Sequence, residues 1–363
     1  PQNLRRTARW LHRQLPIRFA RRIEDMLQLP HVVVSTPSIH RMLKIYLETF
    51  ESVREFQEVR TDEQESQFFF LVRDQMQKHN PGTQLVAEGY RDLRAMYPEM
   101  HLDTFLNDLF TTRIATRILM ENYLAMRQPR QGYVGVVRQG MRPVDIVGDV
   151  AKELTPLTES LYGVAPPVEY VGNLDTVLDY IPRHVHYMVR EVLKNAFRAT
   201  IERHLVRQGH SSGSSSSSSA PVIPPVQVEL QQGDIHVIIK IADQGGGMPK
   251  HIQQTCWQYG WTTVNDGADE SCSWGGAVAS AAAQDRKRRQ SELAGYGFGL
   301  PLTRLHAQYF GGDVNMQALP GHGTNMYLIL THLKEGTPST EIDDLSTVLY
   351  RREEITRSSK DAP

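Results

Sequence analysis

The stretch that decides the fold is residues 184–204, His-Val-His-Tyr-Met-Val-Arg-Glu-Val-Leu-Lys-Asn-Ala-Phe-Arg-Ala-Thr-Ile-Glu-Arg-His. Its apolar residues recur three and four positions apart, which predicts an amphipathic helix with one buried stripe. Pro182 comes just before this stretch, and a proline suits the first turn of a helix. The predicted stripe consists of Val185, Met188, Val189, Val192, Leu193, Ala196 and Phe197.

A second face of the same predicted helix is polar. Glu191, Asn195 and Arg198 are four and then three residues apart, so they lie on one side of a helix. A carboxamide oxygen can bind a hard cation such as Mg²⁺, and a carboxylate can accept a proton. Taken alone, the pattern is more typical of the solvated face of an ordinary helix, so a functional interpretation depends on the rest of the chain.

Three glycine-rich segments follow downstream. Asp243-Gln-Gly-Gly-Gly247 comes directly after a β-like run at 237–242. The other two are Gly295-Tyr-Gly-Phe-Gly-Leu-Pro301 and Gly321-His-Gly-Thr324. Glycine lets the backbone approach a ligand closely, and amides at the start of a helix bind phosphates. Each motif is weak evidence on its own, but the fixed order of the helix and the three segments predicts a nucleotide site.

This order resembles the GHKL class of ATP-binding domains, which includes gyrase and histidine kinases. Residues 191–200 and 295–301 are more similar still to the mitochondrial protein kinases of the pyruvate dehydrogenase and branched-chain 2-oxoacid dehydrogenase complexes. The similarity extends over residues 4–333 and departs at a serine-rich insertion, at the lid and in the tail. It implies an α+β protein in which a helical bundle precedes a GHKL-type α/β sandwich.

The resemblance also implies roles for individual residues. Asn195 would hold Mg²⁺, Asp243 would accept from the adenine amino group of ATP, and Glu191 would be the catalytic base. His79 would support that base, although Pro81-Gly82 departs from the family and a lone histidine is more often structural. Further nucleotide contacts are implied for Arg198, Gly245, Gly247, Thr262, Thr263, Gly295, Tyr296, Gly297, Phe298, Gly299, Leu300 and Thr324.

Substrate, partners and location follow from the same resemblance. The family phosphorylates a serine of the E1 component of a mitochondrial 2-oxoacid dehydrogenase complex. A lipoyl domain of its E2 core binds the bundle, the sheet forms a homodimer, and the location is the mitochondrial matrix. Residues 35–39 look like the pyruvate dehydrogenase kinases, which we favour, whereas 86–89 and 133–137 look like the branched-chain enzyme.

Two other classes of function remain open at this stage. A protein histidine kinase would produce acid-labile phosphohistidine, but no histidine here lies in the setting of a phosphoacceptor helix. An ATP-gated scaffold would have no need of Glu191, Asn195 and Asp243 together. The chain has no GxxxxGK[ST], HRD or DFG motif, so neither the P-loop nor the eukaryotic protein-kinase scaffold applies.

Composition sets broad limits. The 363 residues are 40% apolar and 22% charged, which is ordinary for a globular protein of two or three domains. The formal net charge of −1 gives no indication of nucleic-acid binding, and no apolar run is long enough for a transmembrane helix. The two cysteines, Cys256 and Cys272, indicate neither a zinc site nor a disulfide framework.

The chain divides into three predicted parts. Residues 1–145 form a helical bundle, with a first helix broken at Pro16 and later helices at 39–56, 62–79, 83–96 and 102–127. A short strand is expected at 133–137. Residues 146–335 form the ATP-binding kinase domain, with a serine-rich loop at 211–219 and a lid at 250–294, and 336–363 form a tail. Outside the central helix, this domain is expected to have helices at 143–161 and 301–310 and strands at 167–171, 226–230, 236–241, 313–318 and 324–330.

Overall fold

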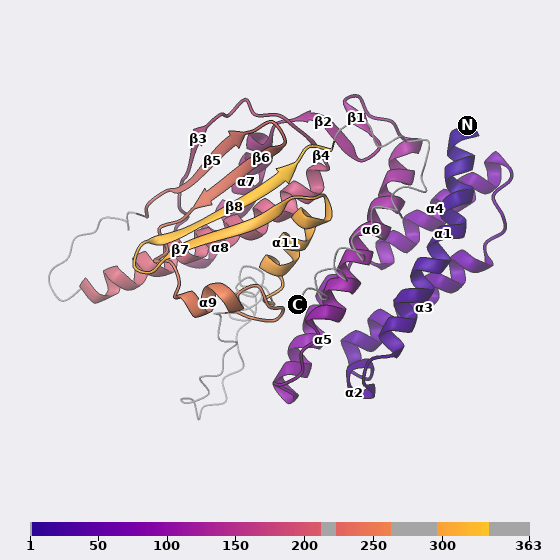
Figure 1. The fold of residues 1–363 in the computed structure, drawn as a ribbon, viewed down its shortest axis with the longest axis horizontal. Helices are drawn as coiled ribbons and strands as arrows, with labels where there is room; N and C mark the ends of the chain where they lie inside the picture. The colour runs from indigo at the N-terminus through magenta and orange to yellow at the C-terminus, as the bar shows by residue number, and fades with distance from the viewer. Residues whose placement is uncertain (1, 212–222, 263–295, 334–363) are drawn as a thin grey trace, which may run out of the picture.

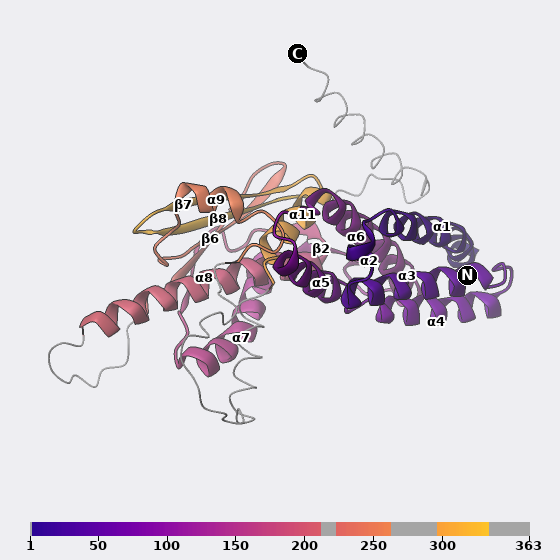
Figure 2. The same ribbon diagram turned by 90° about the horizontal axis from the view of Figure 1, so that it is seen from below.

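The structure, a computed structural model, describes residues 2–211, 223–262 and 296–333. The bundle lies beside a sheet covered by helices (Figures 1 and 2). The fold class predicted from the sequence, an α+β protein with a bundle followed by a sandwich, is thereby confirmed. The predicted serine-rich loop, the tail and most of the predicted lid lie outside the described residues.

The bundle is built from long helices whose buried residues are three or four apart. Its elements are α1 (Gln2–Leu27), α2 (His31–Val34), α3 (Pro37–Glu55), α4 (Asp62–Lys78), α5 (Gly82–Met96) and α6 (Asp103–Arg127). The predicted break at Pro16 is wrong, because α1 continues through it. Leu11, Leu15 and Phe19 are buried on both sides of the proline, so packing of this face holds the helix together.

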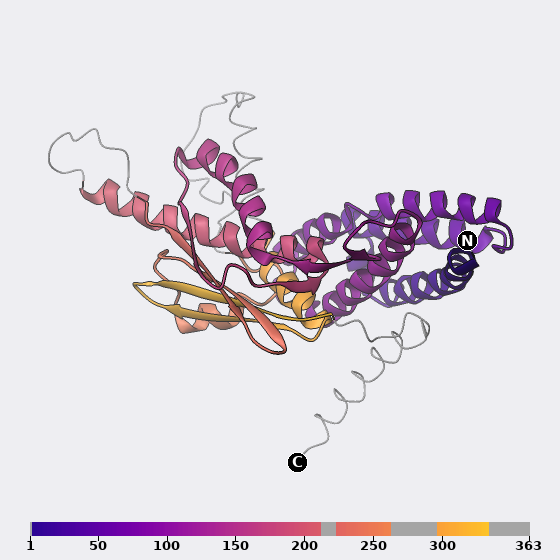
Figure 3. The same cartoon turned by 90° about the horizontal axis from the view of Figure 1, so that it is seen from above.

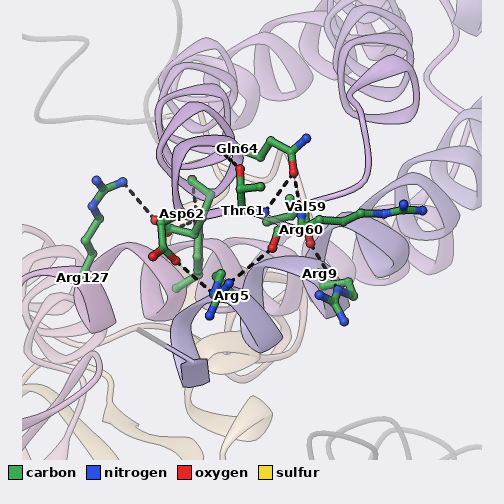
Figure 4. A network of polar contacts seen from close by, with 10 residues as sticks. Arg5, Arg9, Val59, Arg60, Thr61, Asp62, Gln64 and Arg127 are labelled. Carbon is green, nitrogen blue, oxygen red and sulfur yellow. Dashed lines mark hydrogen bonds and ion pairs between the residues drawn. The ribbon is translucent and has the colours of Figure 1, made fainter.

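The loop between α3 and α4 is attached to the start of α1 (Figure 4). Arg5 forms an ion pair with Asp62 at 3.0 Å, and Arg9 donates to the Val59 carbonyl at 3.2 Å. Thr61 caps α4 by accepting from the Gln64 amide, while the Gln64 side chain accepts from the Thr61 amide. This reciprocal capping box satisfies two backbone donors that the helix start would otherwise leave unpaired.

A small sheet connects the two parts. The strand predicted at 133–137 is instead a hairpin of β1 (Tyr133–Val134) and β2 (Val137–Met141), because Gly135 turns the chain with φ of 57°. Strand β4 (Leu178–Tyr180), which was not predicted, pairs with β2 to complete a three-stranded sheet. This sheet brings the chain to the start of α8 (Pro182–Ser211).

The main sheet has the strand order β3-β5-β6-β8-β7, with only β3 and β5 parallel. Its strands are β3 (Val168–Gly172), β5 (Val226–Gln232), β6 (His236–Ala242), β7 (Asp313–Leu319) and β8 (Gly323–Thr331). Every second residue of β5, β6 and β8 is buried, so one face of the sheet is apolar. Helix α8 and α11 (Gly299–Tyr309) contact that face, and α7 (Pro143–Tyr162) packs on α8 (Figure 3).

The hydrophobic interior forms two clusters. One lies between the helices of the bundle, and the other lies between α7, α8 and the sheet. Three residues beyond the bundle in sequence, Tyr259, Phe298 and Leu302, belong to the bundle cluster.

The predicted lid begins with a short helix, α9 (Lys250–Thr255), which was not predicted. Among the described residues, no helix combines the length and the apolar character that crossing a membrane requires.

Candidate functional site

Helix α8 carries the predicted chemistry on one side and core packing on the other. All seven residues of the predicted apolar stripe are buried, with exposures of 4% or less. On another side, Glu191, Asn195, Ala199 and Arg203 follow one another at every fourth position. At 1.5 Å of rise per residue, this row extends about 18 Å along the helix. A single rigid element therefore sets the spacing of groups at both ends of the site.

Glu191 lies at the end of this row that faces α11. Its Oε2 accepts from the Lys194 ammonium at 2.7 Å, and its Oε1 lies 3.6 Å from Arg190. Both Glu191 and Lys194 are largely buried, with side-chain exposures of 12% and 4%. A Cβ on Gly299 would overlap Glu191 Oε2, so the first turn of α11 lies directly against this carboxylate. A carboxylate beside the start of a helix is placed to accept a proton where a phosphate would bind.

Asn195 lies one turn further along α8 and is exposed. The described residues provide no hydrogen-bond partner for its carboxamide, whose oxygen is therefore free to bind a ligand. Oxygen donors of this kind suit Mg²⁺, which binds through few protein ligands and keeps several waters. The residue present thus fits the predicted metal role.

Asp243 follows β6 and is held by backbone amides. Its Oδ1 accepts from the Gly245 amide at 2.8 Å and from the Thr324 amide at 3.2 Å. Burial raises the pKa of the Asp243 carboxyl from 3.8 to about 6, while these two hydrogen bonds and the charge of Arg203 oppose that rise. The backbone bonds leave Oδ2 available to accept from a ligand, as an adenine amino group requires.

The loops around Asp243 line a cavity of about 770 Å³ that is open to solvent. A Cβ on Gly245 would overlap Ala199, so this glycine allows the loop to lie directly on α8. Gly247 packs against the backbone of the turn between β7 and β8. Thr324, at the start of β8, is buried, and its carbonyl accepts from the Asp243 amide at 2.9 Å. The cavity is lined by Arg203, His204, Asp243, Gln244, Gln253, Met316, Gln317, Ala318, Leu319, Gly321, His322, Gly323 and Asn325.

The predicted phosphate loop leads into α11 at Gly299. Gly297 has φ of 74° and its carbonyl accepts from the Gly260 amide at 3.1 Å, while Leu300 packs with the α/β core. The side chains between the glycines contact the bundle, because Phe298 is buried against Tyr90 and Phe110 and the Tyr296 hydroxyl donates to Glu88 at 3.3 Å. The backbone of this loop is therefore the part that remains to face a nucleotide.

Other predicted site residues have different surroundings. Arg198 donates to Glu202 at 2.6 Å, on the side of α8 where the Tyr162 hydroxyl also reaches Glu202. Thr262, within the predicted lid, is exposed. Thr263 and Gly295 lie outside the described residues. Within the described structure, Arg198 thus points to an intrahelical partner.

His79 lies in the core of the bundle. Its Nε2 is 3.0 Å from the Thr49 hydroxyl, its ring stacks on Phe19, and it meets Tyr46 edge-on at 4.9 Å. Burial, followed by the charges of Arg113 and Arg117, lowers the pKa of His79 to about 3, so the ring is neutral at pH 7. The described contacts of His79 are with bundle residues, whereas those of Glu191 are with α8 and α11.

Three residues of the site were missed by reasoning from the sequence. Lys194 was identifiable, because it is three residues after Glu191 and so shares its side of the helix. Arg203 is in register with Asn195 at a spacing of eight, but its partners lie more than forty residues away. Tyr259 gave no local signal, and its hydroxyl donates to Asn107 at 2.9 Å.

Comparison with known proteins agrees with this geometry. Residues 1–138 match the family described as mitochondrial branched-chain alpha-ketoacid dehydrogenase kinase. Residues 180–334 match the family described as histidine kinase-, DNA gyrase B-, and HSP90-like ATPase.

Individual relatives extend over most of the chain. A mitochondrial [pyruvate dehydrogenase (acetyl-transferring)] kinase of Arabidopsis thaliana is 29% identical over 337 residues, which are 92% of this chain and 86% of the relative. Isozyme 4 of that kinase from Homo sapiens is 28% identical over 89% of this chain and 76% of its own length. The Drosophila melanogaster enzyme is 26% identical over 90% and 77%.

Proposed function

We propose that this chain, which belongs to the mitochondrial protein kinases with a GHKL-type ATP-binding domain, phosphorylates a serine of the E1 component of the pyruvate dehydrogenase complex. That it is an ATP-using protein kinase follows from the two family matches and from its relatives. The observation that carries the proposal is the position of Glu191 beside Gly299, at the start of α11, with Asn195 one turn further along α8.

In this arrangement, adenine binds near one end of the row from Glu191 to Arg203 on α8, and phosphate binds near the other. At one end, Asp243 accepts from the adenine base and the loops of the 770 Å³ cavity surround it. At the other, the amides that begin α11 bind phosphate, where each helix-dipole contribution is about 0.3–1 kcal/mol. The Asn195 oxygen would hold Mg²⁺, which would supply positive charge to offset the negative charge of the phosphates.

Glu191 removes the proton from the attacking serine hydroxyl in this proposal. The ion pair with Lys194 holds the carboxylate in place and keeps it from turning away from Gly299. His79 remains a proposed supporting residue, but its contacts with Thr49 and Phe19 restrict it to acting through the bundle. Its effect should therefore be smaller than that of Glu191.

The role of Glu191 is tested with Glu191→Gln. The amide keeps the shape but cannot take a proton, so we expect kcat to fall about 10²–10⁴-fold with unchanged ATP affinity in calorimetry. Asn195→Ala is the contrasting variant and should lose Mg²⁺-dependent ATP binding itself. His79→Ala should lie between the wild type and Glu191→Gln in rate. If Glu191→Gln weakens ATP binding as strongly as Asn195→Ala does, the base assignment is wrong.

The protein substrate has two candidates. The relatives of this chain named above are pyruvate dehydrogenase kinases, whereas the family matched by residues 1–138 is described by the branched-chain enzyme. Incubation with radiolabelled ATP and each purified E1, followed by phosphosite mapping, decides between them. We expect acid-stable phosphoserine on pyruvate dehydrogenase E1, and label only on the branched-chain E1 would reverse the choice.

The remaining proposals concern organisation and location. We propose a bundle at 1–145 that binds a lipoyl domain of the E2 core, a kinase domain at 146–335 and a tail at 336–363. The mitochondrial names of the relatives support a mitochondrial location, which we propose to be the matrix. A homodimer formed through the sheet is proposed as well. Light scattering that gives monomer mass at every concentration would refute the dimer.

A further inference from the structure

Arg203 lies at the far end of the row that begins with Glu191 on α8. Its Nη1 donates to the His322 carbonyl at 2.5 Å and to the Gln244 carbonyl at 3.4 Å, and its Nη2 donates to the Gly321 carbonyl at 2.5 Å. One guanidinium thus contacts two segments that are more than seventy residues apart in sequence. The two segments are residues 243–247 and 321–324. Of these, Asp243, Gln244, Gly321, His322 and Gly323 line the cavity.

These two segments contact each other mainly through backbone bonds. The Gly321 amide donates to Gly246 at 2.8 Å, and the Gly246 amide donates to His322 at 3.2 Å. Gly246 has φ of 94°, and Arg203 lies directly against its Cα, where a Cβ would stand 3.2 Å from Nη1. Glycine-rich loops lose much conformational entropy on ordering, so a few backbone bonds leave them prone to separate. The planar fork of an arginine, with its five donors, is suited to joining several carbonyls at once.

We propose that Arg203 is a positioning residue of the nucleotide site, which fastens the loop after β6 to the turn before β8 and so holds the adenine pocket in its binding geometry. The proposal rests on the proposed role of Asp243. Arg203 lies about 18 Å along α8 from Glu191, which is too far for it to act in phosphoryl transfer. Its charge has a second effect, since it favours the ionised form of the Asp243 carboxyl.

Removing this fork should weaken ATP binding without slowing the chemistry. If the pocket is properly formed in only a fraction of molecules, the apparent Kd rises by the inverse of that fraction. For Arg203→Gln we expect the Kd for ATP, measured by calorimetry without a protein substrate, to rise about tenfold or more. The KM for ATP should rise in parallel, with kcat within about twofold, as for a loss of uniform binding.

Arg203→Lys separates geometry from charge. A lysine keeps the positive charge but lacks the planar fork, so its Kd should also rise. The pH below which ATP affinity is lost should stay unchanged in Arg203→Lys and move upward in Arg203→Gln. The charged and titratable groups around Asp243 in this cavity are Arg203, His204 and His322, and only the first is altered.

Arg142→Gln is the matched control, because Arg142 also donates to a backbone carbonyl, that of Leu174 at 3.2 Å, and lies outside the site. Its Kd for ATP should not change. Faster amide exchange of Gly246 and Gly321 in ATP-free Arg203→Lys would support the proposal even if Arg203→Gln does not fold. A lower melting temperature with an unchanged Kd would overturn it. Wild-type protein that binds ATP but labels neither E1 would instead refute the proposed function alone.

Discussion

At the scale of single residues, Asp243 lowers the stability of the empty protein at neutral pH, although the proposed site needs it to bind ATP. Its carboxyl is buried next to two backbone donors, and this burial raises its pKa to about 6. The pKa of the Asp243 carboxyl is higher in the folded state than its unfolded value of 3.8, so protonation of this carboxyl favours the folded state. This contribution is fully present below about pH 4. That contribution is lost as the pH rises through 6. At pH 7 the empty protein therefore holds a carboxylate that it would be more stable without.

Asp243→Asn should accordingly stabilise the empty protein and abolish ATP binding. The amide oxygen can still accept from Gly245 and Thr324, and no charge is buried. A shift of about two pH units corresponds to at most about 3 kcal/mol in the free energy of unfolding at pH 7. Urea denaturation at pH 7 and at pH 4 measures this gain, which should disappear at pH 4.

Asp149→Asn provides the control for this substitution, because Asp149 is a surface partner of Lys152 with 66% side-chain exposure. It should change the free energy of unfolding by less than about 0.5 kcal/mol. A stability of Asp243→Asn that is lower than the wild type at pH 7 would contradict the assigned desolvation. Retained ATP binding in the same variant would contradict the proposed contact with adenine.

At the scale of elements, α11 is positioned by contacts at its start as well as along its length. Phe298 precedes its first residue and packs edge-on against Phe110 of α6, with ring centroids 5.9 Å apart. Tyr259, which lies within the predicted lid, contacts both rings. The phosphate loop is therefore fastened to the bundle, although its neighbours in sequence belong to the α/β sandwich.

Phe298→Ala should destabilise the protein by about 3–5 kcal/mol, as expected when a buried aromatic ring is removed. Because the loop would lose its anchor, ATP affinity should fall as well. A double-mutant cycle with Phe110→Ala should reveal a coupling free energy of about 0.5–1.5 kcal/mol in urea denaturation. Phe70→Ala is the control, since Phe70 is 51% exposed. Additive effects of Phe298→Ala and Phe110→Ala would show that the rings do not interact.

At the scale of the whole molecule, the two hydrophobic clusters are joined where the nucleotide would bind. Tyr259, Phe298 and Leu302 belong to the bundle core, and Leu302 is in the same helix as residues that contact the sheet. Asp103 of α6 also accepts from the Tyr259 amide at 3.1 Å. The contact between the two parts combines buried apolar packing with hydrogen bonds, so they should not unfold independently.

Thermal unfolding by calorimetry should accordingly show one transition. ATP at 100 times its Kd should stabilise this transition by about 2.7 kcal/mol, and the shift should be absent in Asp243→Asn. Two transitions, of which ATP moves only one, would show that the bundle is not coupled to the nucleotide site.

The sequence by itself determined most of the elements and predicted the chemistry that they would carry. The three- and four-residue spacing of apolar residues defined α8, because this period follows from the geometry of one segment. The order of Glu191, Asn195, Asp243 and the glycine segments was sufficient to predict the fold class, which is confirmed. Pro16 misled the prediction because a local rule on proline ignores the packing of Leu15 and Phe19 around it.

Only the tertiary structure decided which surfaces meet. Phe298 and Tyr259 looked like parts of a loop and a lid, yet both pack in the bundle core. Arg203 was given no role from the sequence, yet it joins two distant loops. His79 was assigned to the site of Glu191 but contacts Thr49 and Phe19. A pattern along the chain shows which face of an element is apolar or charged, but the partner of that face is set by contacts between residues far apart in sequence, which no local period records.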